Sequence, residues 1–226
     1  MKTNEVVASV MVERVRCLLE ESRDPSELVG IGDVRQLTIE DLILANLPEA
    51  ISTVTLMAPS DMLTDVAEVV LSVDKTGDEH LDDRKRIERP ADAIRVVWLK
   101  ADTWDVPSYD VLQGTSPEYR ICQNKRVYSL GVKGRPTAFY VWSDGKRVIE
   151  LYPSACKYVE MGYVEKPELK DGKIQCDVRL YEAACYYCAY LVSMIQGWRS
   201  AEGYRREAAA SLGVELQAAV QDGQGQ

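Results

Sequence analysis

Apolar residues recur at helical spacing near both ends of the chain, whereas the middle of the chain alternates with the shorter period of β-strands. Near the N-terminus, Val7, Met11, Val15 and Leu18 fall on one helical face. This spacing predicts a helix over about 5–21.

A second helix is predicted after Thr38, a candidate N-cap, and its apolar positions continue as far as Pro59. Pro48 falls inside this stretch. A proline in a helix removes one backbone hydrogen bond and crowds the preceding turn. Pro48 therefore either kinks this helix or begins a second one capped by Asn46. Both interpretations make 5–58 a helical region.

The middle of the chain is rich in β-branched residues. A strand is predicted over 66–73, and the nearly all-polar stretch 74–88 that follows predicts a charged loop. In the next strand, alternation places Ile94, Val96 and Trp98 on one face.

The clearest turn signal lies in the predicted hairpin 137–152. Asp144 and Gly145 separate two β-rich runs there, and both residue types tolerate the positive φ angles of a tight hairpin turn. A further strand over 157–164 is expected to complete a small antiparallel sheet with this hairpin. A short helical turn is predicted around 109–113.

The C-terminal quarter returns to helical spacing. A helix over 178–196, ended by Gly197, is apolar around much of its circumference, so we expect it to be central. A last helix extends to about residue 217 unless Gly213 ends it early. The polar, glycine-rich residues 218–226 are expected to form a flexible tail.

The elements are therefore segregated into helices, strands and helices again, an order that predicts an α+β fold. We expect a helical bundle of N-terminal and C-terminal helices, a small antiparallel β-sheet and long charged loops. The length of 226 residues suits one domain over 1–226. Its parts would be helices at 5–58, strands and loops at 63–164, and helices at 178–217.

The charge balance restricts the function. The chain has 27 basic and 36 acidic side chains, a formal charge of −9 and a pI near 4.8. General nucleic-acid binding and anionic membrane binding both depend on Lys and Arg, so neither is expected. The most apolar run, 183–195, is shorter than the roughly 20 residues that span a bilayer, and no signal peptide is visible. We expect a soluble protein made in the cytoplasm.

Cys185 and Cys188 form the motif with the most active-site character. A thiol pair at a helix N-terminus can carry out disulfide exchange, but this pair falls inside a predicted helix, which favours packing. Three further features could carry chemistry: His80 as a catalytic base, the glycine-containing segment 131–136 as a phosphate loop, and the carboxylates of Asp78, Glu79, Asp82 and Asp83 as calcium ligands. A loop or turn is the preferred interpretation of each. No catalytic, cofactor-binding or metal-ligating residue is therefore predicted.

Aromatic usage is skewed, with four tryptophans and twelve tyrosines against one phenylalanine. Tyr and Trp suit half-buried surfaces between subunits, because each has an apolar body and a polar tip. The candidates for such subunit contacts are Trp104, Trp198 and Tyr204. Three other aromatic residues are expected to fill the core of the sheet, namely Trp98, Phe139 and Trp142.

Four segments together resemble one known family: LTIEDLILANLPEAISTV (37–54), RPADAIRVVWLKADTW (89–104), LYPSACKYVEMGYV (151–164) and YEAACYYCAYLVSMIQGWRSAEGYRREAAASL (181–212). In order and pattern they resemble the head-to-tail connector adaptors of tailed bacteriophages, the tail tubular or gatekeeper-type ring proteins below the portal. The resemblance covers about 37–216. Arg89 departs from it, because an apolar residue is more usual there.

The resemblance implies a non-enzymatic virion protein of the phage neck, made in the host bacterial cytoplasm. Such adaptors form a ring, typically twelve-fold, that docks on the portal protein, leads to tail or other neck proteins and lines the DNA channel. An acidic lumen would let DNA pass without specific binding. No cofactor and no membrane are implied. Two alternatives stay open: another phage head- or tail-completion protein, and a small cytoplasmic α+β enzyme or binding protein.

Overall fold

The computed structural model describes residues 5–21, 39–64, 66–73, 85–123, 134–143 and 145–215. The chain divides into two compact units. The helical unit comprises residues 1–62 and 167–226, so it is built from both ends of the chain, and the β unit comprises 63–166. The predicted α+β class is confirmed, because helices and strands are segregated in this way. Whether the two units act as one domain stays a prediction.

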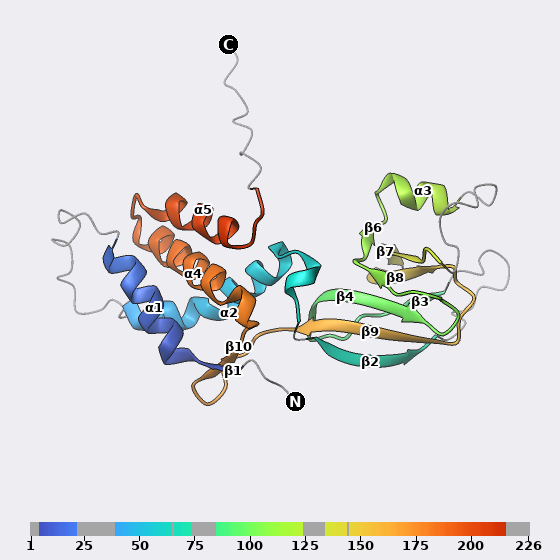
Figure 1. Cartoon of the computed structure of the whole chain (residues 1–226), viewed down its shortest axis with the longest axis horizontal. Coiled ribbons are helices and arrows are strands. Elements are labelled where there is room, and N and C mark those ends of the chain that lie inside the picture. Colours follow the sequence, from blue (N-terminus) through green and yellow to red (C-terminus); the bar gives the residue numbers. More distant parts are fainter. Residues whose placement is uncertain are drawn as a thin grey trace, which may run out of the picture. The chain divides into compact units, whose positions relative to one another are not determined.

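In the helical unit, three helices pack around a fourth, α4, which contacts each of them. Figure 1 shows α4 in orange beside α5, with α1 and α2 on its other sides. The predicted central position of this helix is therefore confirmed. The helices are α1 (Ala8–Glu21), α2 (Ile39–Met57), α4 (Tyr181–Gln196) and α5 (Ala201–Ser211).

The first helix begins later than the periodicity predicts. Glu5–Val7 is a strand, β1, which pairs antiparallel with β10 (Lys173–Gln175). Val7 is consequently exposed, whereas Met11, Val15 and Leu18 are buried as expected. Helical spacing alone does not reveal this pairing, because its partner lies far along the chain.

Pro48 lies inside one continuous helix, so α2 neither ends there nor restarts. The backbone of α2 stays helical as far as Met57, and Ser60–Met62 forms a 3-10 turn after Pro59. The candidate cap Thr38 lies outside the described residues. Of the two interpretations offered by the sequence, the single helix is correct.

The C-terminal helices follow the prediction closely. A short 3-10 helix, Val178–Leu180, is capped by the side chain of Asp177 and leads into α4, which ends at Gly197 in the left-handed conformation. Met194 and Ile195 are exposed, so the last turn of the predicted apolar face of α4 is not covered. In α5, Gly213 has a φ of +65° after the last helical turn, so it ends this helix early.

Within the described residues, the β unit has two four-stranded sheets, ordered β2-β9-β4-β5 and β3-β8-β7-β6. Figure 1 shows them as stacked layers, with α3 beyond the second sheet. The bounds are β2 (Ala67–Ser72), β3 (Arg86–Ile87), β4 (Ala93–Ala101), β5 (Ser108–Tyr109), β6 (Leu112–Gln113), α3 (Pro117–Gln123), β7 (Thr137–Ser143), β8 (Lys146–Tyr152) and β9 (Tyr158–Glu165).

A hydrophobic core fills the space between the two sheets. It draws alternate residues from β2, β4 and β9 on one side and from β7 and β8 on the other. The predicted hairpin is confirmed as β7–β8, with Gly145 at a φ of +75° in its turn. The predicted strand 157–164 is confirmed as β9.

The expectation of one small antiparallel sheet is wrong. Strand β9 pairs with β2 and β4, while the hairpin lies in the other sheet, where β6 pairs parallel with β7. The predicted helical turn at 109–113 is also wrong, because this stretch supplies β5 and β6 and the helix follows Pro117. Long-range pairing decides both points.

The faces of β4 differ from simple alternation. A register shift between Val96 and Trp98 puts Val96 in the core while Trp98 points to the opposite face. Phe139 is fully buried as expected, but Trp142 is 77% exposed, so its predicted core position is wrong. Trp142 stands near the end of β7, past the residues that meet the other sheet.

Candidate functional site

Cys185 and Cys188 lie on the buried side of α4, and both thiols are inaccessible to solvent. Burial raises the pKa of Cys185 to about 12, and nearby Glu182 acts in the same direction. Burial also raises the pKa of Cys188, whose Sγ lies 3.7 Å from the carbonyl oxygen of Ile43. Disulfide exchange needs a thiolate of lowered pKa. These contacts favour the packing interpretation of the pair.

The aromatic candidates for subunit contacts fall into two groups. Trp104 is buried in the β unit, where its Nε1 donates to the carbonyl oxygen of Pro153 at 2.9 Å. Tyr204 is buried in the helical unit, and its hydroxyl donates to the carbonyl oxygen of Leu18 at 2.8 Å. Little of either side chain is left exposed for a neighbouring subunit, because each fills the core of its own unit. Trp198 is half-buried after α4 and stays a candidate.

Most of the other residues considered for chemistry lie outside the described part of the chain. They are His80, the carboxylates of Asp78, Glu79, Asp82 and Asp83, and residues 131–133 of the glycine-containing segment. Gly134 precedes β7, in keeping with a turn before the hairpin. Among the described residues, no group of three or more His, Cys, Asp or Glu side chains could hold a metal ion.

One surface of the β unit is a stronger candidate for a functional site than any of these residues. It is the side of the β2-β9-β4-β5 sheet that faces away from the core, here called the outer sheet face. The strand register places the residues of this face in rows that run across the sheet. One row consists of Glu68, Gly162, Trp98 and Tyr109, and the next row consists of Val70, Glu160 and Lys100. Tyr158 lies at the end of β9, opposite Ser72. Two acidic side chains and one lysine thus alternate with large apolar and aromatic ones.

Three large side chains of the outer sheet face stand in solvent. Val70 is 65% exposed, Tyr109 is 67% exposed and Tyr158 is 55% exposed. Alternating strands with one solvated face usually place polar residues there. Aromatic residues beside apolar ones, with charges interspersed, are instead typical of surfaces that bind another protein.

Trp98 lies beside Gly162 in the outer sheet face, and its indole packs over this glycine. A Cβ atom built on Gly162 would come within 2.1 Å of Trp98 Nε1, so only glycine leaves room for the indole in this position. The sequence contains Gly162 and the alternation of β2, but without the strand order neither could be connected to Trp98 or Tyr109. Sequence reasoning therefore missed this surface.

A buried polar cluster lies on the far side of the other sheet, under α3. Glu150 on β8 is fully buried. Its Oε1 accepts hydrogen bonds from the hydroxyls of Tyr152 and Tyr119, and its Oε2 lies 3.3 Å from Arg86 Nε. Around Phe139, the rings of Tyr119 and Tyr152 are packed edge-on or tilted. Because its partners come from β3, β8 and α3, this carboxylate joins three elements, and we assign it a structural role.

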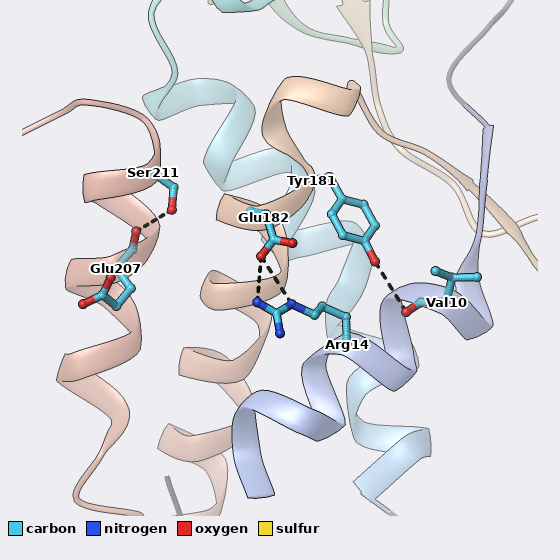
Figure 2. Close-up of polar contacts among 6 residues, drawn as sticks. All are labelled: Val10, Arg14, Tyr181, Glu182, Glu207 and Ser211. Carbon is cyan, nitrogen blue, oxygen red and sulfur yellow. Dashed lines mark hydrogen bonds and ion pairs between the residues drawn. The ribbon is translucent and has the colours of Figure 1, made fainter. Parts of the chain in front are cut away.

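In the helical unit, polar contacts connect α1 with α4 at the surface. Arg14 on α1 donates from Nε and Nη2 to Glu182 Oε2, at 3.3 and 3.2 Å, and the hydroxyl of Tyr181 lies 3.5 Å from the carbonyl oxygen of Val10 (Figure 2). On α5, Ser211 donates to the carbonyl oxygen of Glu207. These contacts hold helices in register and do not converge on a space that could hold a substrate.

A cleft of about 490 Å³ lies beside the start of α1. Most of its walls are apolar, from Val12, Leu44 and Leu169, with Glu40, Asp171 and Lys173 adding charge. The turn before β10 closes one side, where the backbone N–H of Ala8 donates to the carbonyl oxygen of Gly172 at 2.8 Å. The opposite charges mixed around this open cleft do not select a particular ligand.

No protein-family model matches the sequence, and no curated protein matches it either. Within the described residues, none of the helices is both long enough and apolar enough to cross a lipid bilayer.

Proposed function

We propose that this chain is a structural subunit without enzymatic activity, and that it forms a ring as a head-to-tail connector adaptor of a tailed bacteriophage. The observation that carries the proposal is the outer sheet face, with Val70, Tyr109 and Tyr158 in solvent around Trp98. A surface of this composition fits permanent contact with other proteins better than it fits a solvated sheet.

The resemblance of four segments to connector adaptors supplies the specific class of assembly. The chain order fits it, since helices from both ends form one unit and the strands between them form another. In a ring, each subunit offers one surface to the next subunit and a different surface to the previous one. The partners proposed here are further copies of this chain, the portal protein, and tail or other neck proteins.

The acidity of the chain suits a channel through which DNA moves. A formal charge of −9 repels phosphate groups, so DNA would pass the ring without being held. We therefore propose a place in the virion neck, between portal and tail.

The oligomeric state of the full chain tests the proposal. Purified protein, alone and mixed with the portal protein of the same genome, would be measured by native mass spectrometry and negative-stain electron microscopy. Rings on the portal are expected, together with weak self-association of the chain alone. A chain that stays monomeric and does not bind the portal, or virions without this chain at the neck, would contradict the proposal.

A matched pair of variants then tests the surface separately from the function. Val70→Lys places a charge in the outer sheet face, while Val178→Lys changes a similarly exposed valine, 71% exposed, in the helical unit. We expect Val70→Lys to weaken ring formation about tenfold or more, which corresponds to a loss of about 1.4 kcal/mol. Val178→Lys should assemble normally. Equal assembly by both variants would leave the ring in place but reject the outer sheet face as its contact.

A further inference from the structure

A cluster of three arginines lies near Tyr140 in the β unit, although the protein as a whole is acidic. Arg147 comes from β8, Arg95 from β4 and Arg89 from the segment before β4. Burial raises the pKa of the Tyr140 hydroxyl, while all three guanidinium groups lie close enough to act on it in the opposite direction. The tyrosine hydroxyl also has a hydrogen bond with the backbone of Val96.

The side chain of Arg147 extends to the edge strand of its sheet. Its guanidinium carbon lies 4.1 Å from the centre of the Tyr140 ring, and its Nη2 donates to Gln113 Oε1 at 3.1 Å. Because Tyr140 is on β7 and Gln113 is on β6, the side chain crosses β7 from β8 and ends at the edge strand. Stacking on an aromatic ring holds a guanidinium in place without using its N–H donors.

The three arginines of the cluster differ in the charge of their hydrogen-bond partners. Arg95 Nη2 lies 3.1 Å from Asp110 Oδ1, an ion pair within the unit. Within the described part of the chain, Arg147 and Arg89 donate to neutral oxygens, the latter to the carbonyl of Ile94 at 3.3 Å. A guanidinium carries five N–H donors, so both side chains can donate further hydrogen bonds to an anion.

At the same edge, the two-residue strand β6 is shorter than its neighbour β7, so the pairing ends before β7 does. Strand β6 pairs only with Phe139 and Tyr140, and the chain then turns away at Gly114, whose N–H donates to the carbonyl oxygen of Tyr140 at 2.8 Å. Backbone groups two residues apart in a strand point to the same side. The N–H and C=O of Trp142 therefore point past the end of β6, where none of the described residues pairs with β7.

We propose that this edge binds an extended, acidic segment of a partner protein, which adds as a strand beside the end of β7 and places a carboxylate on Arg147 and Arg89. Strand addition would use the backbone of Trp142, and the exposed indole would cover the segment. A planar guanidinium matches a carboxylate with two parallel hydrogen bonds.

Charge favours a protein segment over nucleic acid. Nucleic-acid binding requires several phosphates to be neutralised, whereas this cluster is a single group of guanidiniums on a chain with a charge of −9. One or two carboxylates on a short segment need no more positive charge than Arg147 and Arg89 supply. The proposal is independent of the ring function, because it concerns a different surface and can be measured with isolated subunits.

Fluorescence polarisation of a labelled peptide tests the proposal on the full chain. The probe is the alternating peptide acetyl-Val-Glu-Val-Glu-Val-Glu-amide, carried on a fluorescent linker. The first control replaces each Glu by Gln, and the second methylates alternate backbone nitrogens of the Glu peptide. We expect binding of the Glu peptide at low salt, at least tenfold weaker binding of the Gln peptide, and loss of binding on backbone methylation.

Variants of the chain then locate the site. Arg89→Gln/Arg147→Gln should weaken binding of the Glu peptide about tenfold or more, while Arg120→Gln, which changes an exposed arginine of α3, should bind normally. Urea unfolding of each variant confirms that it is folded. The proposal is overturned if the Glu peptide does not bind, if the Gln or methylated peptide binds equally well, or if the arginine pair makes no difference. It is also overturned if a twelve-residue oligothymidine binds more tightly than the Glu peptide through the same arginines.

Discussion

Removing the guanidinium of Arg86 should destabilise the β unit far more than removing a surface arginine does. Arg86 lies 3.3 Å from Glu150, whose carboxylate is fully buried. The variant Arg86→Met keeps most of the side-chain volume and removes the guanidinium, while the hydrogen bonds from the hydroxyls of Tyr119 and Tyr152 to Glu150 stay in place. The perturbation therefore measures how much the contact between Arg86 and Glu150 contributes to the stability of the β unit.

The expected size follows from the contacts. Breaking a buried ion pair by removing one partner costs about 3–5 kcal/mol. Here the arginine side chain is 33% exposed and the contact is long, while Oε1 of Glu150 keeps its hydroxyl donors. We therefore expect the free energy of unfolding of the β unit to fall by about 2–3 kcal/mol. Replacing both partners, as Arg86→Met/Glu150→Leu, removes the buried charge and should recover most of this loss.

Urea denaturation followed by tryptophan fluorescence suits this measurement. Trp98, Trp104 and Trp142 lie in the β unit and only Trp198 lies in the helical unit, so the signal reports mainly on the β unit. With a urea slope of about 1–1.5 kcal/mol per molar for a unit of this size, the midpoint should fall by about 2 M. Far-ultraviolet circular dichroism follows the helices in parallel.

Two results would refute this reasoning. Arg120→Met, on the exposed surface of α3, serves as the matched control and should change stability by less than about 0.5 kcal/mol. If Arg86→Met is no more destabilising than this control, Glu150 does not depend on its guanidinium partner. If the double variant is as unstable as Arg86→Met alone, the cost comes from lost packing and not from a buried charge.

Two further predictions concern the outer sheet face and the thiols. Gly162→Ala should lower the free energy of unfolding by about 1–3 kcal/mol, because its new methyl group collides with the indole of Trp98. The loss should largely disappear in a Trp98→Leu background. An equal loss in both backgrounds would reject the clash. The thiols of Cys176 and Cys185 have pKa values of about 12 in the folded chain against an ordinary 9.0. Unfolding therefore releases protons between about pH 9 and 12, and the urea midpoint should fall as pH rises through this range, whereas a constant or rising midpoint would contradict the burial argument.

Local sequence patterns determined the elements whose signals lie within a few neighbouring residues. The hairpin 137–152 follows from Asp-Gly between β-rich runs, and α4 follows from its apolar circumference and the glycine after it. The α+β class follows from the order of such elements. In contrast, helical spacing predicts helix at Val7 and at 109–113, but Val7 pairs with Lys173, and 109–113 supplies strand residues that pair with β4 and β7. Local spacing does not indicate a pairing partner elsewhere in the chain.

Tertiary structure alone decided which strands share a sheet and which side chains meet. Glu150 appears in the sequence as one of many acidic residues, and only the packing of β3 and α3 on β8 makes it a buried centre of contacts. The sequence makes Trp104 and Tyr204 candidates for contacts between subunits, but both are buried within the core of their own unit. The arginines around Tyr140 come from two sheets. Hydrophobic periodicity fixes which side of an element is buried, but it does not specify the partner that buries it, because apolar burial is non-directional and strand register depends on residues far apart in the chain.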